Sequence, residues 1–137
     1  MPNEFNQQVI DEFRANEGQV GGMFEGAPLV LLTTKGAKSG RQTTTPVMYV
    51  EDGDRYVIIA SNGGADHHPA WYHNLRATPE GMAEVGTETF EVEAVFVEGE
   101  ERDRLYARMV AQAPGFAEYE AKTTRRIPVV ALLRTAA

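Results

Sequence analysis

The chain has 137 residues, 42% apolar and 24% charged, which is the composition of one globular domain. Its 13 lysines and arginines against 20 aspartates and glutamates give a net charge of −7. That charge argues against a nucleic-acid binder and against docking on anionic lipid by charge alone. Cysteine is absent, which excludes disulfides, zinc–thiolate sites and cysteine nucleophiles. With neither a signal-peptide pattern nor an apolar run near the ~20 residues of a membrane span, a cytoplasmic location is expected.

Hydrophobic periodicity predicts about six strands and three or four short helices. In chain order these are a helix (4–15), three strands (29–34, 43–50, 55–60), a helix (69–76), two strands (82–85, 89–97), two helical segments (100–112, 116–122) and a strand (128–133). Alternation is cleanest in the fifth strand, whose apolar residues share one face while Glu91 and Glu93 lie on the other. Pro46 cannot donate to a ladder, so the second strand is expected to be an edge or to carry a bulge.

Consecutive strands joined by short turns predict an antiparallel sheet with the helices outside it. A small closed or partly closed barrel is the simplest such architecture, so the expected class is α+β, mainly β. A Rossmann unit is excluded because no strand–GxGxxG–helix pattern occurs. Residues 1–25 are predicted to form a helix and a glycine-rich, mobile connection over 17–26, followed by the barrel at 26–137 within a single domain overall.

The charge is unevenly distributed along the chain. Residues 26–50 contain no acid but carry Lys35, Lys38 and Arg41, whereas residues 77–101 contain eight acids and no base. The basic stretch also contains glycines and several threonines, and backbone donors, hydroxyls and cations together suit a phosphate or carboxylate group. A solvated hairpin turn is the alternative.

A second candidate segment covers residues 60–75, where a predicted strand leads through Gly63 and Gly64 into a helix that begins with aromatic residues. Paired glycines allow backbone N–H groups to approach a ligand closely, and a helix N-terminus attracts anions. Trp71, the only tryptophan, can pack against a planar ring, although core packing is the simpler interpretation.

All three histidines, His67, His68 and His73, lie in the same segment. His68 and His73 are five residues apart and do not share a helix face as i, i+4 residues do. The HExxH pattern is also absent, so no metal site is predicted and ordinary loop histidines are the expected reading.

Covalent hydrolase chemistry is not expected, because neither Ser39 nor Ser61 lies in a GxSxG motif and the chain has no cysteine. The chain has few side chains that could be activated for catalysis, but it has two loops suited to binding a ligand. This combination indicates that a bound cofactor carries out the chemistry. Tyr119, in the predicted helical segment, is a candidate hydroxyl donor at a pocket mouth. An aromatic cap on the barrel end is the alternative for it.

These segments together resemble the deazaflavin-dependent nitroreductase family. Residues 36–46 resemble its G-x-[KR]-[ST]-G-x-x-x-x-x-P segment, and residues 60–75 resemble its A-S-x-G-G-A-x-x-x-P-x-W-Y-x-N-L hallmark. Residues 125–130 resemble its closing R-x-I-P-V-V strand. The motifs occur in family order at family spacing, so the resemblance extends over nearly the whole chain.

The resemblance implies a split β-barrel of about six mostly antiparallel strands that uses reduced coenzyme F-420. The implied reaction is hydride transfer from this deazaflavin to an electron-poor acceptor: a quinone, a nitroaromatic or an unsaturated lactone. The anionic tail of the coenzyme would match the basic stretch. A non-enzymatic lipid or small-anion binding protein on the same fold, or a flavin mononucleotide-dependent reductase, is the alternative. A homodimer and peripheral contact with a membrane are left open.

By the family pattern, Ala37, Lys38 and Ser39 would meet the phosphate end of the cofactor, and Arg41 would add charge. The other residues implied to bind the cofactor are Thr43, Thr44, Thr45, Pro46, Val47, Met48, Ile59, Ala60, Ser61, Asn62, Ala70, Trp71, Tyr72, His73 and Asn74. Ser61 and Tyr119 are the implied catalytic proton donors.

Several residues depart from the family pattern. Thr43 stands where many members have arginine, Asn62 replaces a lysine of the nitroimidazole-reducing members, and Met48 replaces a tyrosine near the ring. Phe116 and Ala113 replace two tyrosines of the substrate pocket, whereas Tyr119 is kept. Cofactor binding is expected to tolerate these changes better than nitroimidazole reduction does.

Overall fold

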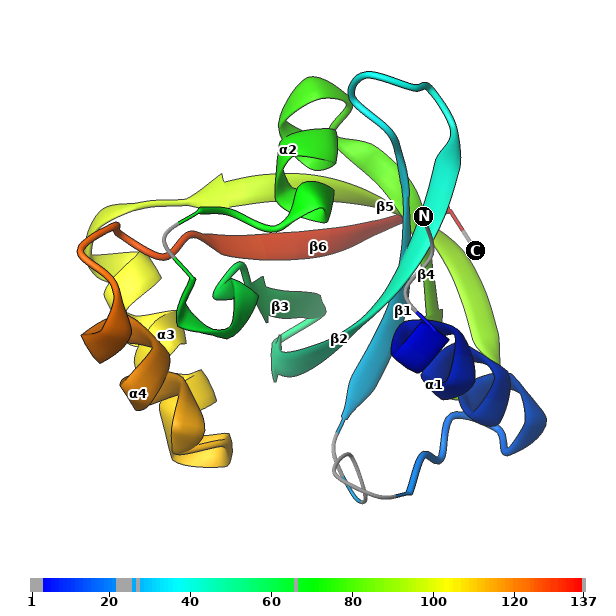
Figure 1. The fold of residues 1–137 in the computed structure, drawn as a ribbon, viewed down its shortest axis with the longest axis horizontal. Helices are drawn as coiled ribbons and strands as arrows, with labels where there is room; N and C mark the ends of the chain where they lie inside the picture. Colours follow the sequence, from blue (N-terminus) through cyan, green and yellow to red (C-terminus); the bar gives the residue numbers. More distant parts are fainter. Residues whose placement is uncertain (1–3, 22–25, 27, 66, 137) are drawn as a thin grey trace.

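Six strands form the sheet of the computed structural model, which describes residues 4–21, 26, 28–65 and 67–136. They are β1 (Leu29–Lys35), β2 (Gln42–Asp52), β3 (Arg55–Ile59), β4 (Glu80–Val85), β5 (Glu88–Val97) and β6 (Val129–Ala136). All paired strands are antiparallel, and the sheet closes into a barrel in the order β1-β2-β3-β6-β5-β4 (Figure 1). The predicted fold class and strand number are confirmed.

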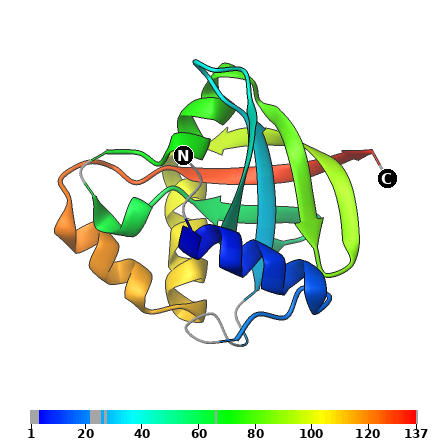
Figure 2. The ribbon, with the colours of Figure 1, turned by 45° about the vertical axis from the view of Figure 1, so that its right-hand side comes forward.

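The described residues form four α-helices and one short 3-10 helix around this barrel. They are α1 (Glu4–Ala15), η2 (Asn62–Gly64), α2 (Ala70–Ala77), α3 (Gly99–Gln112) and α4 (Gly115–Lys122). Figure 2 shows α1 lying across the outside of the strands while α2 sits at one end of the barrel. None of the described helices has the length and apolarity that crossing a bilayer requires. Residues 22–25 of the predicted connection lie outside the described residues.

Strands with continuous apolar sequences are those buried on both faces. In β1, Val30 and Leu32 belong to the barrel interior, while Leu29 and Leu31 pack against the apolar face of α1. The same division holds for β3 and β6, whose second face is covered by α3. The outer face of β5 is exposed at Glu91 and Glu93 and is covered only at Val97, which shares a core with α3, so the sequence alternates over residues 90–94.

Pro46 lies in a half of β2 that has one neighbour. It is opposite Leu31 of β1, whereas β2 pairs with β3 only over Tyr49 to Asp52. The expected edge is therefore local: residues 42–48 are unpaired on one side, where the missing N–H of a proline disturbs no second ladder. This open half of β2 forms one wall of the cavity described below.

An ion cluster centred on Asp52 joins the end of β2 to α3. Its carboxylate accepts hydrogen bonds from Arg55, from Arg108 at 2.9 Å and from Arg104 at 3.3 Å. The bond from Arg55 is the main reason why the pKa of the Asp52 carboxyl is lowered to about 2, and the bond from Arg104 adds to it.

Acid is expected to weaken the fold through Asp52. Because the pKa is lowered in the folded state, the stabilisation is complete above the unfolded-chain value of about 4 and is lost as the pH falls towards 2. Urea denaturation across this window should give a free energy of unfolding that falls less steeply in Asp52→Asn than in the wild type. Asp54→Asn, on the same turn, should follow the wild type; equal slopes in all three proteins would refute the prediction.

Candidate active site

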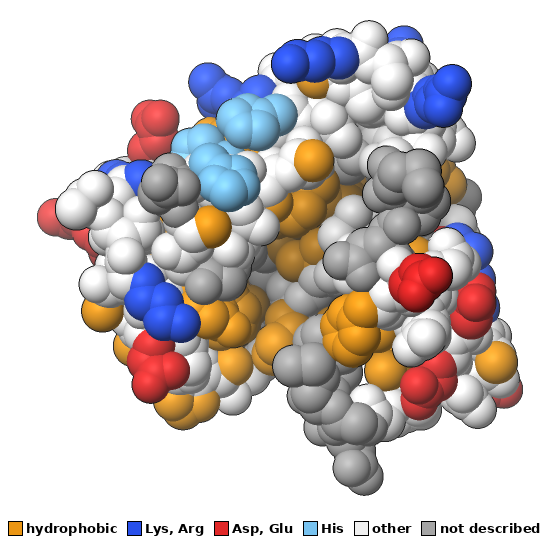
Figure 3. Space-filling view, in the orientation of Figure 1, with side chains coloured by type: hydrophobic (Ala, Val, Ile, Leu, Met, Phe, Trp, Pro, Cys, Tyr) orange, Lys and Arg blue, Asp and Glu red, His pale blue; other side chains and the backbone are white. Residues whose placement is uncertain are grey.

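A cavity of about 770 Å³ lies between the open half of β2, the start of α2 and α4. Its lining residues are Asn6, Thr45, Pro46, Val47, Met48, Ile59, Ser61, Asn62, His67, His68, Pro69, Ala70, Trp71, His73, Phe116 and Tyr119. Figure 3 shows it as a hollow at the centre of one face, with an apolar floor and histidines along its rim. Its size and mainly apolar walls are typical of a site for a small organic ligand.

Two walls of the cavity face each other across the hollow. Residues 45–48 of β2 form the first wall. Phe116 and Tyr119 of α4 form the second, and their rings pack edge to face with centroids 5.1 Å apart. The hydroxyl of Tyr106 donates a hydrogen bond of 2.6 Å to the Phe116 carbonyl, which ties α4 to α3. Burial foremost raises the pKa of the Tyr106 hydroxyl to about 12, so this donor keeps its proton.

The segment that follows β3 contributes Ser61 and Asn62 to the cavity. Asn62 has a φ of 49°, in the left-handed region that asparagine tolerates better than most residues. The Ala60 N–H donates 3.0 Å to the carbonyl of Pro128, which fixes the start of this segment beside β6. Arg125 reaches the segment from the same side and donates to three of its carbonyls.

Helix α2 joins the cavity to the basic hairpin between β1 and β2. Trp71 is 6% exposed and packs in the barrel core, as the simpler interpretation expects, and it also belongs to the lining of the cavity. The buried Asn74 amide donates 3.0 Å to the Thr34 hydroxyl, and its oxygen accepts from the Ala37 N–H, also at 3.0 Å. These bonds hold the hairpin against α2, and Lys and Arg side chains gather along that upper edge in Figure 3.

Among the residues implied by the family pattern, the cavity brings together Thr45, Pro46, Val47, Met48, Ile59, Ser61, Asn62, Ala70, Trp71, His73 and Tyr119. The hairpin residues Ala37, Lys38, Ser39 and Arg41 are exposed beyond it, and Thr43 and Thr44 precede the lining part of β2. Ala60, Tyr72 and Asn74 lie behind the lining residues.

Four lining residues were not assigned to the site from the sequence, namely Asn6, His67, His68 and Pro69, whereas Phe116 was named only as a replacement in the substrate pocket. His67, His68 and Pro69 fall inside the second motif, so their position was available in the sequence, although a role was not. Asn6 carries no local signal, because only the packing of α1 beside β2 brings it to the cavity.

His68 is a lining residue whose imidazole has a lowered pKa. Burial lowers the pKa of its imidazole, and the adjacent Arg125 guanidinium lowers it further, with smaller contributions from His73 and His67. The Nδ1 atom of His68 lies 2.9 Å from an Arg125 nitrogen. A neutral imidazole is therefore favoured on this wall. Among the described residues, no group of three or more His, Asp or Glu side chains could hold a metal ion.

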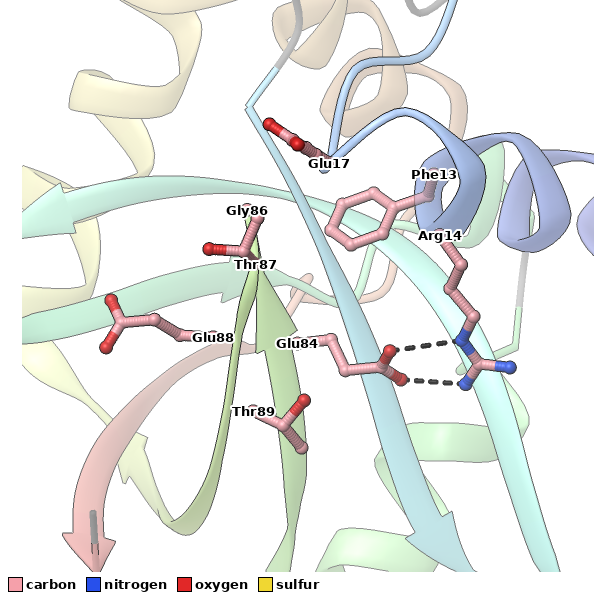
Figure 4. Close-up of a pocket in the computed structure, with 8 residues that line it drawn as sticks. All are labelled: Phe13, Arg14, Glu17, Glu84, Gly86, Thr87, Glu88 and Thr89. Atoms are coloured by element: carbon pink, nitrogen blue, oxygen red, sulfur yellow. Dashed lines mark hydrogen bonds and ion pairs between the residues drawn. The ribbon is translucent and has the colours of Figure 1, made fainter.

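A smaller cavity of about 230 Å³ lies between the end of α1 and the β4–β5 turn. Figure 4 shows that Arg14 and Glu84 meet there, and the guanidinium donates to both carboxylate oxygens at 3.0 and 2.8 Å. This pair fastens α1 to β4. None of the residues predicted to bind a cofactor lines this cavity.

Comparison with protein families gives a match over residues 6–134 to the family described as F420H(2)-dependent quinone reductase. An F420H(2)-dependent quinone reductase of Mycobacterium tuberculosis strain H37Rv is 41% identical over 128 residues, which cover 89% of this chain and 85% of the relative.

Comparison with solved structures also finds an F420-dependent reductase. A structure described as an F420-H2 dependent reductase is 42% identical with a TM-score of 0.71, covering 77% of this chain and 93% of that one. A structure described as a domain-swapped dimer is 37% identical with a TM-score of 0.72, covering 94% and 95%. The haem storage protein HutZ of Vibrio cholerae shares the fold at 18% identity and a TM-score of 0.62, covering 96% and 92%.

Proposed function

Because the chain belongs to the F420H(2)-dependent quinone reductase family, we propose that its large cavity binds reduced coenzyme F-420 and a quinone side by side. Family membership confirms the expected reductase, its deazaflavin cofactor and the quinone class of acceptor. Nitroaromatics and unsaturated lactones stay predictions. One observation carries the proposal: Pro46 at the end of the first motif segment, the second motif segment and Tyr119, which are far apart in sequence, line one cavity.

The residues present fit this cofactor. Pro46, Val47 and Phe116 offer apolar surface to a planar ring, and the hydroxyls and amides of Thr45 and Asn62 offer hydrogen bonds at its edges. The cofactor tail is anionic, and the hairpin held against α2 supplies cations in an otherwise acidic protein.

Hydride donation is the chemistry that the coenzyme supplies when bound. The chain orients the two ligands between β2 and α4, excludes water from the apolar floor, and offers a proton to the reduced acceptor oxygen. Ser61, 7% exposed, and Tyr119 present hydroxyls from different walls of the cavity, and these two are the candidate proton donors.

Titration of the purified protein with coenzyme F-420 and with flavin mononucleotide tests this proposal. Deazaflavin fluorescence should change at micromolar coenzyme, and the reduced form should be oxidised when a quinone is added. Binding of flavin mononucleotide alone would favour the flavin-dependent alternative. Binding of neither, with binding of a lipid or small anion, would favour a non-enzymatic protein and refute the proposal.

Lys38→Ala is expected to weaken coenzyme binding about tenfold at low salt, because a charge-assisted contact to the phosphate is lost. Rising sodium chloride should reduce the difference, since the hairpin is exposed and its charges are screened. Arg14→Ala removes the same charge at a residue that does not line the large cavity and should bind like the wild type. Equal affinity of the Lys38 variant and the wild type by fluorescence titration would remove Lys38 from the phosphate site.

Assembly and location are further parts of the proposal. The similar structure described as a domain-swapped dimer supports a homodimer for this chain, which sedimentation velocity would test. The apolar face of α1 shares a core with β1, which supports one domain over residues 1–137. The exposed Phe5 on α1, beside the cavity residue Asn6, supports contact of a cytoplasmic protein with a membrane surface, which vesicle co-sedimentation would test.

A further inference from the structure

We propose that Arg125 is a positioning residue of the active site, which holds the backbone of residues 60–65 and fixes His68 as an Nε2–H donor on the cavity wall. Arg125 does not itself line the cavity, so it acts through the residues that do. The inference rests on the proposed function only for its binding experiment, because the state of His68 can be measured without coenzyme.

The first part of the argument is the set of bonds to the segment. The Arg125 guanidinium donates to the carbonyls of Ser61 at 2.7 Å, Ala65 at 2.9 Å and Ala60 at 3.2 Å. These carbonyls come from both ends of a turn that includes η2, so one planar group closes the turn. A guanidinium has five donors in a rigid fork, whereas the single ammonium nitrogen of a lysine cannot span the three carbonyls.

The second part is the tautomer of His68. Arg125 is always protonated and only donates, so the His68 Nδ1 atom 2.9 Å away must accept. The ring proton of the neutral imidazole then resides on Nε2. Tyr72 and His73 pack against the His68 ring, with centroids at 4.7 and 5.7 Å, and restrict its rotation.

The third part is the charge around His68. The titratable groups facing it among the described residues are Arg125 from the segment before β6, His73 and Tyr72 from α2, and the neighbouring His67. Burial of the ring is the main reason why the pKa of His68 is lowered, and the positive charge of Arg125 adds to it, so the ring stays neutral and its Nδ1 can accept.

Arg125 therefore affects two polar residues of the cavity lining, Ser61 and His68. The carbonyl of Ser61 is fixed by Arg125, so the backbone that carries the Ser61 side chain is held in place at the lining. His68 presents one donor of fixed identity on the same side of the cavity. Arg125 therefore sets the hydrogen-bonding groups that the lining offers to a bound coenzyme, although Arg125 itself is not part of the lining.

Long-range proton–nitrogen correlation spectra of the histidine rings test the tautomer directly, with the His68 signals assigned by their loss in His68→Asn. The wild type should show the Nε2–H tautomer, with a midpoint of protonation below the ordinary value of about 6.5. In Arg125→Met the tautomers should mix and the midpoint should rise. An Nδ1–H tautomer in the wild type, or a midpoint above the ordinary value, would overturn the proposal even if the Arg125 variants failed to fold.

Coenzyme titration tests the positioning role. Arg125→Met should raise the Kd for coenzyme F-420 at least about tenfold, and Arg125→Lys should not restore it. Arg126→Met is the matched control, since Arg126 is exposed and pairs with Asp103, and it should bind like the wild type. Circular dichroism verifies that the variants are folded. Wild-type affinity in folded Arg125→Met would overturn the proposal, whereas failure of the wild type to bind coenzyme would refute the proposed function instead.

Two replacements of His68 distinguish a role as hydrogen-bond donor to the coenzyme from a role as acceptor for Arg125. Glutamine can place a donor near the position of Nε2, whereas asparagine places a polar atom near Nδ1 that can accept from Arg125. A donor role predicts that His68→Asn weakens binding about tenfold and His68→Gln by about threefold or less. The opposite order would mean that His68 serves only to hold Arg125, and it would overturn this part of the proposal.

Discussion

Ala70→Trp is expected to lower the affinity for reduced coenzyme F-420 about 100-fold, which corresponds to about 2.7 kcal/mol. Ala70 is the first residue of α2; its side chain is exposed and lines the large cavity. An indole at this position would occupy the space beside the open half of β2, where the ring of the coenzyme is proposed to lie. Because Ala70 supports no packed core, the loss should come from blocked volume and not from unfolding.

Ala77→Trp is the matched control, because Ala77 is the last residue of the same helix, is also exposed, and does not line the cavity. Both replacements carry a similar small cost in helix propensity of roughly 0.5 kcal/mol. Fluorescence titration and thermal melting of the two variants should show equal melting temperatures and a large difference in Kd. Comparable affinities would place the coenzyme elsewhere and contradict the proposed function.

Arg102→Met is expected to lower the free energy of unfolding by about 3 kcal/mol. Arg102 is 4% exposed and donates two hydrogen bonds to the Ile127 carbonyl, at 2.7 and 3.1 Å. It also pairs with Glu120 of α4 at 3.1 Å and lies over the Tyr106 ring. Methionine would keep much of the volume but leave a buried carbonyl without these donors, so α3, α4 and the approach to β6 would lose a common anchor.

Urea denaturation gives the measurement, with Arg126→Met as the control. Arg102 and Arg126 each bond the Asp103 carboxylate at 3.0 Å, but the side chain of Arg126 is 62% exposed, so its loss should cost less than about 1 kcal/mol. Because α4 carries Phe116 and Tyr119, Arg102→Met should also raise the KM for quinone under conditions in which the variant is still folded. Equal stability losses in both variants would show that the buried carbonyl contact is unimportant.

Local patterns predicted the helices and strands well because the burial of each strand face determines which residues in the sequence are apolar. Strands between the barrel interior and a helix have continuous apolar sequences, as in β1, whereas β5 alternates because one of its faces meets solvent. Pro46 likewise predicted an edge, and β2 is open at that residue. The helix over residues 4–15 was predicted from its spacing, although Phe5 at its start is 46% exposed and lies outside the core.

Much of the candidate site was also predictable, since the two motif segments carry most of the cavity lining. Arg125 was visible only as part of a motif, and its function was not. Its bond to Ser61 joins residues 64 positions apart, and nothing in the local pattern of either segment indicates such a contact. The same holds for Asn74, which links α2 to the basic hairpin across 37 positions.

Local patterns were enough to predict the class of fold, the order of its elements, the family and the two segments that build the site, because periodicity, turn chemistry and motifs are local properties. Long-range packing sets which strands become neighbours, such as β3 beside β6, and where β2 stays open. It also places α4 opposite β2 across the cavity and brings Arg125 to the wall between them. These features depend on contacts between distant segments, which form only when the barrel closes and buries its apolar faces.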